Sequence, residues 1–115
     1  MGFELLKKQI VGSTGMPYQT IAVSKSSIGL SADLGRYFAG HKFVEVYLNR
    51  DELQVGLIPS NNKDKGYRVY FTENKHSTKV NLAVRFIMRN VARGIYPITL
   101  QGNMLVFPVM EIPAQ

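Results

Sequence analysis

The sequence contains no cysteine among its 115 residues. This absence excludes disulfides, thiol catalysis and zinc sites with cysteine ligands, and it fits a reducing, cytoplasmic compartment. The sequence has no run of about 18 consecutive apolar residues, so we expect no membrane-spanning helix and no membrane partner. Hydrophobic residues make up 45% of the chain and charged residues 19%, which excludes a disordered chain and favours a globular one.

The motifs that carry most enzyme chemistry are also missing. His41 and His76 are isolated, without the HxxxH or HExxH spacing of a metal site, and the eight acidic residues are scattered. The segment Ser13-Thr14-Gly15 lacks the GxxxxGK[ST] spacing of a phosphate loop. We therefore expect a binding protein and not an enzyme, with no metal and no cofactor.

The order of the expected elements indicates an internal duplication, with residues 20–59 as the first copy. Two short extended segments lead to Ser31, whose hydroxyl suits a helix N-cap. A helix is expected over about 32–39, and Gly40 ends it in the left-handed conformation that glycine adopts readily. Two strands joined by a polar turn follow and end at Pro59, which is typical of a hairpin.

Residues 67–113 repeat this order as the second copy, after a polar linker at 60–66; residues 1–19 form an N-terminal arm. Asn81 is the expected N-cap of a helix over about 82–93, and Gly94 stops this helix. The chain is thus predicted to be one domain of the α+β class. Two tandem β-β-α-β-β repeats would form an antiparallel sheet or barrel that carries two helices.

Positive charge is concentrated in one part of the chain. The net charge is +6, from 14 basic and 8 acidic residues. The segment 63–93 holds eight basic residues against two acidic ones, a difference of six that accounts for the whole net charge. A local basic field of this kind is the electrostatic signature of phosphate binding, although a solvated surface can have the same composition.

Three arginines of this segment, Arg85, Arg89 and Arg93, are spaced four residues apart. On the expected helix they would form one stripe, which suits contacts with successive phosphates. Like charges at this spacing repel by about 0.2–0.5 kcal/mol per pair, a cost that a polyanionic partner would offset. The alternative is a solvated helix face.

The strand expected at 67–72 supplies further candidates. If Tyr67, Val69 and Phe71 face the core, Arg68 and Tyr70 point outward and form a platform for base stacking and phosphate binding. The alternative places Tyr70 in the core and leaves Phe71 partly exposed. The candidate nucleic-acid-binding residues are Arg68, Tyr70, Lys75, Lys79, Arg85, Arg89 and Arg93.

Short motifs carry a resemblance to a known family: Ile28-Gly29-Leu30-Ser31, Val44-Glu45-Val46-Tyr47 and Gln54-Val55-Gly56-Leu57-Ile58-Pro59. From about residue 20 to 109 the chain resembles an uncharacterised family of small bacterial and phage-like proteins with two strand-helix-hairpin repeats. The element order looks like the Whirly fold, which implies single-stranded DNA binding. Residues 31–59 are similar to the AbrB-type swapped hairpin, which implies contact with duplex DNA.

The preferred interpretation is a nucleic-acid-binding protein whose partner is single-stranded DNA, bound by the basic and aromatic surface of the second repeat. One alternative is an AbrB-like regulator that binds duplex DNA. Another is a phage-type accessory or protein-interaction module with no nucleic-acid role. Its apolar contact surface would comprise Met88, Met104, Met110 and Phe107. Self-association into a homo-oligomer is left open.

Overall fold

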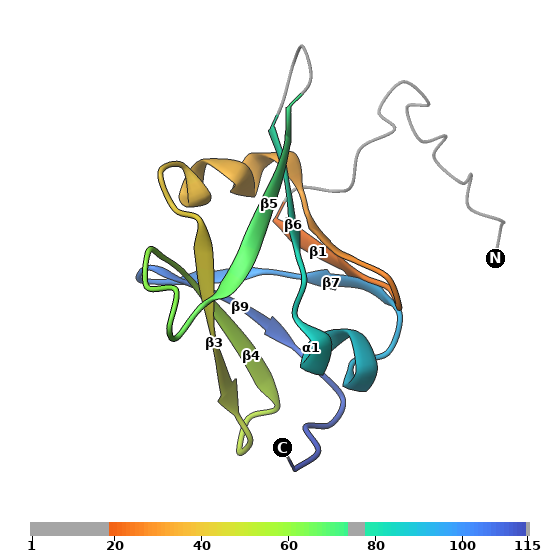
Figure 1. The fold of residues 1–115 in the computed structure, drawn as a ribbon. Helices are drawn as coiled ribbons and strands as arrows, with labels where there is room; N and C mark the ends of the chain where they lie inside the picture. Colours follow the sequence, from red (N-terminus) through yellow and green to blue (C-terminus); the bar gives the residue numbers. More distant parts are fainter. Residues whose placement is uncertain (1–18, 74–77, 115) are drawn as a thin grey trace, which may run out of the picture.

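The computed structural model describes residues 19–73 and 78–114, and most of the regular structure in these ranges is β-strand (Figure 1). The strands are β1 (Thr20–Val23), β2 (Ile28–Leu30), β3 (Phe43–Asn49), β4 (Gln54–Ser60), β5 (Tyr67–Glu73), β6 (Thr78–Leu82), β7 (Gly94–Pro97), β8 (Thr99–Gln101) and β9 (Met104–Pro108). The 3-10 helix η1 (Ala32–Phe38) follows β2, and the α-helix α1 (Arg85–Asn90) follows β6. No helix within these ranges is long and apolar enough to cross a membrane.

The strands form one antiparallel sheet in the order β7-β1-β2-β6-β5-β3-β4-β9-β8. The strands at the two ends of this order, β7 and β8, are separated in the sequence by Ile98 alone. The sheet must therefore curl until its first and last strands meet, which makes it nearly closed and barrel-like. Ile98 is buried at this junction, and its amide donates to the carbonyl oxygen of Gln19 at 2.7 Å, which extends the β1–β7 ladder.

Strands of the first half of the chain pair with strands at the corresponding places of the second half. β2 pairs with β6, and β4 pairs with β9. The hairpins β1–β2 and β5–β6 close with the same spacing, because their last pairs, Val23–Ile28 and Glu73–Thr78, are 50 positions apart. These pairings are compatible with two copies related by a two-fold axis, and the duplication itself stays a prediction.

The prediction of an α+β fold with two full helices is wrong, because the second helix is half the expected length. Residues 80–82 are extended and pair with β2 on one side and β5 on the other, and this pairing overrides the helix start expected at Asn81 and Leu82. Asn81 therefore lies within a strand and is not a helix N-cap. α1 begins after Val84, which has no side-chain cap, and ends at Asn90. Gly94 begins β7 and does not stop the helix.

The first helical segment begins after Ser31 as expected, but it is a 3-10 helix and the Ser31 hydroxyl does not cap it. The hydroxyl accepts a hydrogen bond from the backbone N–H of Thr20 at 3.1 Å, which ties β1 to the end of β2. The carboxylate of Asp33 accepts from the N–H of Gln19, with 3.1 Å to each oxygen. Gly40 follows with φ of +79°, the left-handed conformation expected for the residue that ends this segment.

The core fills the inside of the curled sheet. Alternate residues of each strand point inward, and the largest buried side chains include Phe38 from η1, Ile87 from α1 and Phe107 from β9. Burying a side chain of this size stabilises the fold by about 1.5–3 kcal/mol. Because the inward-facing residues stabilise the core, the outward-facing residues of the sheet are the ones available for contacts with other molecules.

Candidate functional site

The β5–β6 hairpin extends beyond the rest of the sheet, as Figure 1 shows. β5 pairs with β6 from Val69 to Glu73. On its other side β5 pairs with β3 only through Tyr67 and Arg68. From Tyr70 onward, the outer edge of β5 therefore has no paired strand among the described residues, and this part of the hairpin is accessible from several directions.

The side chains of β5 alternate as expected only near its start. Val69 is 2% exposed and belongs to the core, whereas Tyr70 is 53% exposed and lies with Arg68 on the outer face. Neither interpretation of this strand holds in full. Tyr67 and Phe71, which one places in the core, are 42% and 41% exposed, and Tyr70, which the other places in the core, is exposed as well. The hairpin leaves the body of the sheet at this point, so a residue that faces inward has little packed beneath it.

The Tyr70 ring is uncovered because its neighbours on the outer face are small. Tyr70 pairs with Asn81 on β6, Asn81 pairs with Gly29 on β2, and Gly29 pairs with Ala22 on β1. The row ends on β7 at Ile95, which is more than half exposed. An exposed aromatic ring at one end of a row of small side chains is accessible to a flat partner such as a base.

Arg68 is held on the outer face by an aromatic contact. Its guanidinium carbon lies 5.7 Å from the centre of the Phe43 ring. Phe43 is the residue of β3 that pairs with Arg68 of β5. Cation–π contact orients a guanidinium without neutralising it. Arg68 therefore keeps its charge for an anionic partner.

The arginine stripe is shorter than expected. Arg85 and Arg89 lie on α1, one turn apart and exposed, but Arg93 lies beyond the helix, in the bend before β7. The prediction of three arginines along one helix is thus wrong, because the chain is already extended at Val91. Among the side chains that the structure describes, none of the three arginines forms an ion pair with an acidic residue.

Two candidates remain, Lys75 and Lys79. Lys75 lies outside the described residues, and the backbone of Lys79 pairs with Thr72 within the hairpin. The last pair of the hairpin at its other end is Val69–Leu82, and α1 begins three residues after Leu82. α1 thus follows closely on the strand that pairs with β5.

The apolar contact surface considered for a protein-interaction module does not form as one patch. Phe107 is fully buried in the core and cannot contribute. Met88 and Met104 are half-buried, and only Met110, next to the C-terminus, is largely exposed.

A second outward feature lies on β3, outside the basic segment of the sequence. The Tyr47 hydroxyl donates to Oε1 of Glu45 at 2.7 Å. This hydrogen bond, with one from Ser60 and the nearby charge of Lys65, lowers the pKa of Glu45, and the same hydrogen bond raises the pKa of Tyr47. The pair therefore holds the tyrosine ring in one orientation above the sheet.

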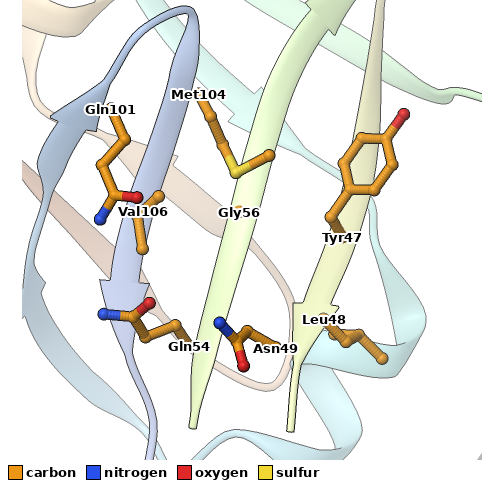
Figure 2. Close-up of a pocket in the computed structure, with 8 residues that line it drawn as sticks. All are labelled: Tyr47, Leu48, Asn49, Gln54, Gly56, Gln101, Met104 and Val106. Atoms are coloured by element: carbon orange, nitrogen blue, oxygen red, sulfur yellow. The ribbon is translucent and has the colours of Figure 1, made fainter. Parts of the chain in front are cut away.

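Beside Tyr47 lies a pocket of about 180 Å³ on the outer face of β3, β4, β9 and β8 (Figure 2). It is lined by Tyr47, Leu48, Asn49, Gln54, Gly56, Gln101, Met104 and Val106. Gly56 pairs with Tyr47 on one side and Val106 on the other, so the row has a gap where other residues would carry a side chain. A glycine inside an alternating strand is the sequence signal that could have indicated this place.

Figure 2 shows how the pocket is arranged. The thioether of Met104 lies over Gly56, the carboxamides of Gln101 and Gln54 lie on one side of it beside Val106, and the ring of Tyr47 lies on the other side. A β-carbon on Gly56 would clash with the sulfur of Met104, which shows how closely the methionine covers the glycine.

Within the described ranges, no group of three or more histidine, cysteine or acidic residues could hold a metal ion. The fold and its outer surface define a class: a small, mostly-β domain with a nearly closed antiparallel sheet and a basic, aromatic hairpin. Comparison with family models, curated proteins and solved structures gives no match that would place this class in a known family. The resemblances to the phage-like family and to the Whirly and AbrB-type folds therefore stay expectations.

Proposed function

We propose that this protein binds nucleic acid, preferably single-stranded DNA, through the outer face of β5 and the arginines of α1. The observation that carries the proposal is the exposure of Tyr70, at 53%, on the same face as the guanidinium of Arg68. An exposed ring with a cation beside it supplies both a stacking surface for a base and a contact for the adjoining phosphate.

The preference for single strands follows from the geometry of stacking. A base stacks on a tyrosine only when it has left its neighbour in the strand, and such contacts contribute about 1–3 kcal/mol per base. Bases in a duplex are already stacked on each other. The uncovered ring of Tyr70, bordered by Asn81 and Gly29, therefore suits an unpaired strand lying across the sheet.

The unneutralised arginines supply the attraction to phosphates. Arg85 and Arg89 repel each other at their four-residue spacing, and no described acidic side chain pairs with either. A phosphate between them offsets this repulsion. With Arg68 they make three contacts, for which the logarithm of the binding constant falls with a slope of about −2 against the logarithm of salt concentration on single strands.

Fluorescence anisotropy with labelled oligonucleotides tests the proposal. We expect the full chain to bind single strands more tightly than duplex of the same sequence, at two salt concentrations. The double variant Arg68→Ala/Tyr70→Ala should lose most of this binding. The control Lys25→Ala/Arg36→Ala removes two exposed basic residues that lie outside β5, α1 and the basic segment 63–93, and it should bind nearly as well as wild type.

Two results would overturn the proposal. One is the absence of binding to either strand form at low salt. The other is equal loss of affinity in the double variant and its control, which would mean that net charge alone attracts the oligonucleotide. Tighter binding to duplex would instead favour an AbrB-like interaction.

A further inference from the structure

We propose that the pocket between Tyr47 and Met104 binds a single nucleobase, as a subsite for an unpaired base of the bound strand. The proposal rests on the proposed function, because the base is taken to belong to the nucleic acid that β5 and α1 hold. It adds a second contact region, on β3, β4, β8 and β9, that lies outside the basic segment of the sequence.

The size of the pocket limits its occupant to one small ring system. Its volume is about 180 Å³. A protein cavity of about 150 Å³ accommodates benzene, whereas sites for drug-sized ligands measure roughly 300–1,000 Å³. The pocket is therefore large enough for a pyrimidine or purine ring and too small for a whole nucleotide cofactor.

The lining favours a neutral ring that forms hydrogen bonds at its edge. Asn49, Gln54 and Gln101 supply carboxamides, and no charged residue is among the lining residues. The carboxamide of Asn49 already accepts from the N–H of Glu52 at 3.1 Å, whereas those of Gln54 and Gln101 form no hydrogen bond with another residue that the structure describes. A carboxamide both donates and accepts, which matches the mixed donors and acceptors along the edge of a base.

Tyr47 and Met104 supply contacts for the faces of the ring. Tyr47 is nearly half exposed, and its hydroxyl is fixed by the hydrogen bond to Glu45, so its ring stands at the side of the pocket. Aromatic rings stack on bases, and thioethers make favourable contacts with aromatic rings. The ionised Glu45, whose pKa is lowered, disfavours a phosphate at this position, which leaves the base as the part of a nucleotide that enters.

The pocket is connected to the proposed interface along β3. Phe43, beside Arg68, and Tyr47 lie four residues apart on the same face of this strand. At a rise of about 3.3 Å per residue, they are about 13 Å apart. A strand held at Arg68 can therefore span this distance and place a base in the pocket, with its phosphates turned away from Glu45, which lies between Phe43 and Tyr47 on this face.

The test uses the methyl signal of Met104 in carbon-13 NMR spectra of the full chain, assigned with Met104→Leu. We expect one or more of the four deoxynucleosides to shift this signal at millimolar concentration. The shift should disappear in Gln54→Ala/Gln101→Ala. It should persist in the control Asn103→Ala, which removes an exposed carboxamide that does not line the pocket. Thermal unfolding of each variant checks that it is folded.

A parallel titration with oligonucleotides separates this proposal from the proposed function. The variant Gln54→Ala/Gln101→Ala should bind a single strand roughly fivefold more weakly than wild type, which is the effect of losing about one net hydrogen bond. On a strand of abasic sites, which has no bases, the variant and wild type should bind equally well. Oligonucleotide binding without any nucleoside shift at Met104 would overturn the pocket and leave the function intact. Nucleoside shifts at Met104 without any oligonucleotide binding would overturn the proposed function and leave the pocket as a site for a base. An equal or larger shift with N-acetyl-tyrosinamide would overturn the assignment to a base.

Discussion

The hairpins β1–β2 and β5–β6 have the same spacing but opposite surroundings. Ile21 on β1 and Phe71 on β5 occupy equivalent places, 50 positions apart, yet Ile21 is fully buried and Phe71 is 41% exposed. β1 is covered along its length by β7, whereas β3 pairs with β5 at only two positions. The surroundings, and not the hairpin itself, therefore decide which strand stabilises the core and which is available for binding.

The two hairpins also differ in charge, and the more exposed hairpin is the more basic one. The turn of the first hairpin reads Ser24-Lys25-Ser26-Ser27, and it is closed by hydrogen bonds between Ser24 and Ser27. The sequence of the second hairpin contains Arg68, Lys75 and Lys79, and the arginines of α1 follow it closely. Exposure and positive charge therefore coincide in one hairpin only.

The first prediction concerns stability, in which the two hairpins should differ most. Ile21→Ala removes a fully buried side chain and should lower the free energy of unfolding by about 2–5 kcal/mol. Phe71→Ala removes a partly exposed side chain and should cost less than half as much. Urea denaturation of the two variants measures the difference, and equal losses would show that both hairpins belong to the core.

The second prediction concerns base stacking. Tyr70→Ala should weaken binding of single-stranded DNA by about 1–3 kcal/mol, roughly 5- to 150-fold, because it removes one stacking surface. Tyr70→Phe should retain most of the affinity. Tyr67→Ala, which removes an exposed tyrosine from the other face of β5, is the matched control. If the Tyr67 variant lost as much affinity in anisotropy titrations as the Tyr70 variant, the outer face would not be the binding face.

The third prediction concerns the arginines of α1. Arg85→Ala/Arg89→Ala should reduce the magnitude of the salt slope for single-stranded DNA by about 1.4, or about 0.7 for each phosphate that is no longer neutralised. Lys25→Ala/Arg36→Ala removes the same charge outside the basic segment and should leave the slope nearly unchanged. A similar reduction in both double variants would assign the effect to net charge and not to α1.

The smallest effect concerns the pair of Glu45 and Tyr47. The pKa of Glu45 should lie below its ordinary value and should rise towards that value in Tyr47→Phe, which removes the main hydrogen bond. Because the pKa is lower in the folded state, the pair stabilises the fold above the ordinary pKa of glutamate. That stabilisation is lost as the pH falls through the lowered pKa. Carbon-13 NMR titration of the Glu45 carboxyl measures the change, and an identical pKa in both proteins would contradict the hydrogen bond.

Local sequence signals predicted much of the sheet and part of the candidate site. Alternation and turn residues located the strands that flank Gly40, and the same alternation suggested that Arg68 and Tyr70 point outward. The length of the second helix could not be predicted, because Asn81 and Leu82 are held extended by Gly29 and Ile28 of β2, which precede them by 52 and 54 positions. Because the helix ends at Asn90, Arg93 lies beyond it and not in line with Arg85 and Arg89.

The pocket could not be predicted from the sequence for a similar reason. Its lining comes from four strands that meet only after folding, and Met104 reaches Gly56 across the pairing of β4 with β9. The glycine alone indicates a close approach, but it does not indicate which side chain approaches. The exposure of Phe71 depended likewise on where β3 stops pairing with β5.

A proton–nitrogen NMR map of the full chain with a short single-stranded oligonucleotide would show which of the two hairpins binds nucleic acid. We expect the largest amide shifts at Arg68, Tyr70 and α1, and little change at Thr20 and Ala22 of the first hairpin. Shifts centred on β1–β2, or spread evenly over both hairpins, would contradict the claim that only the exposed, basic hairpin binds nucleic acid.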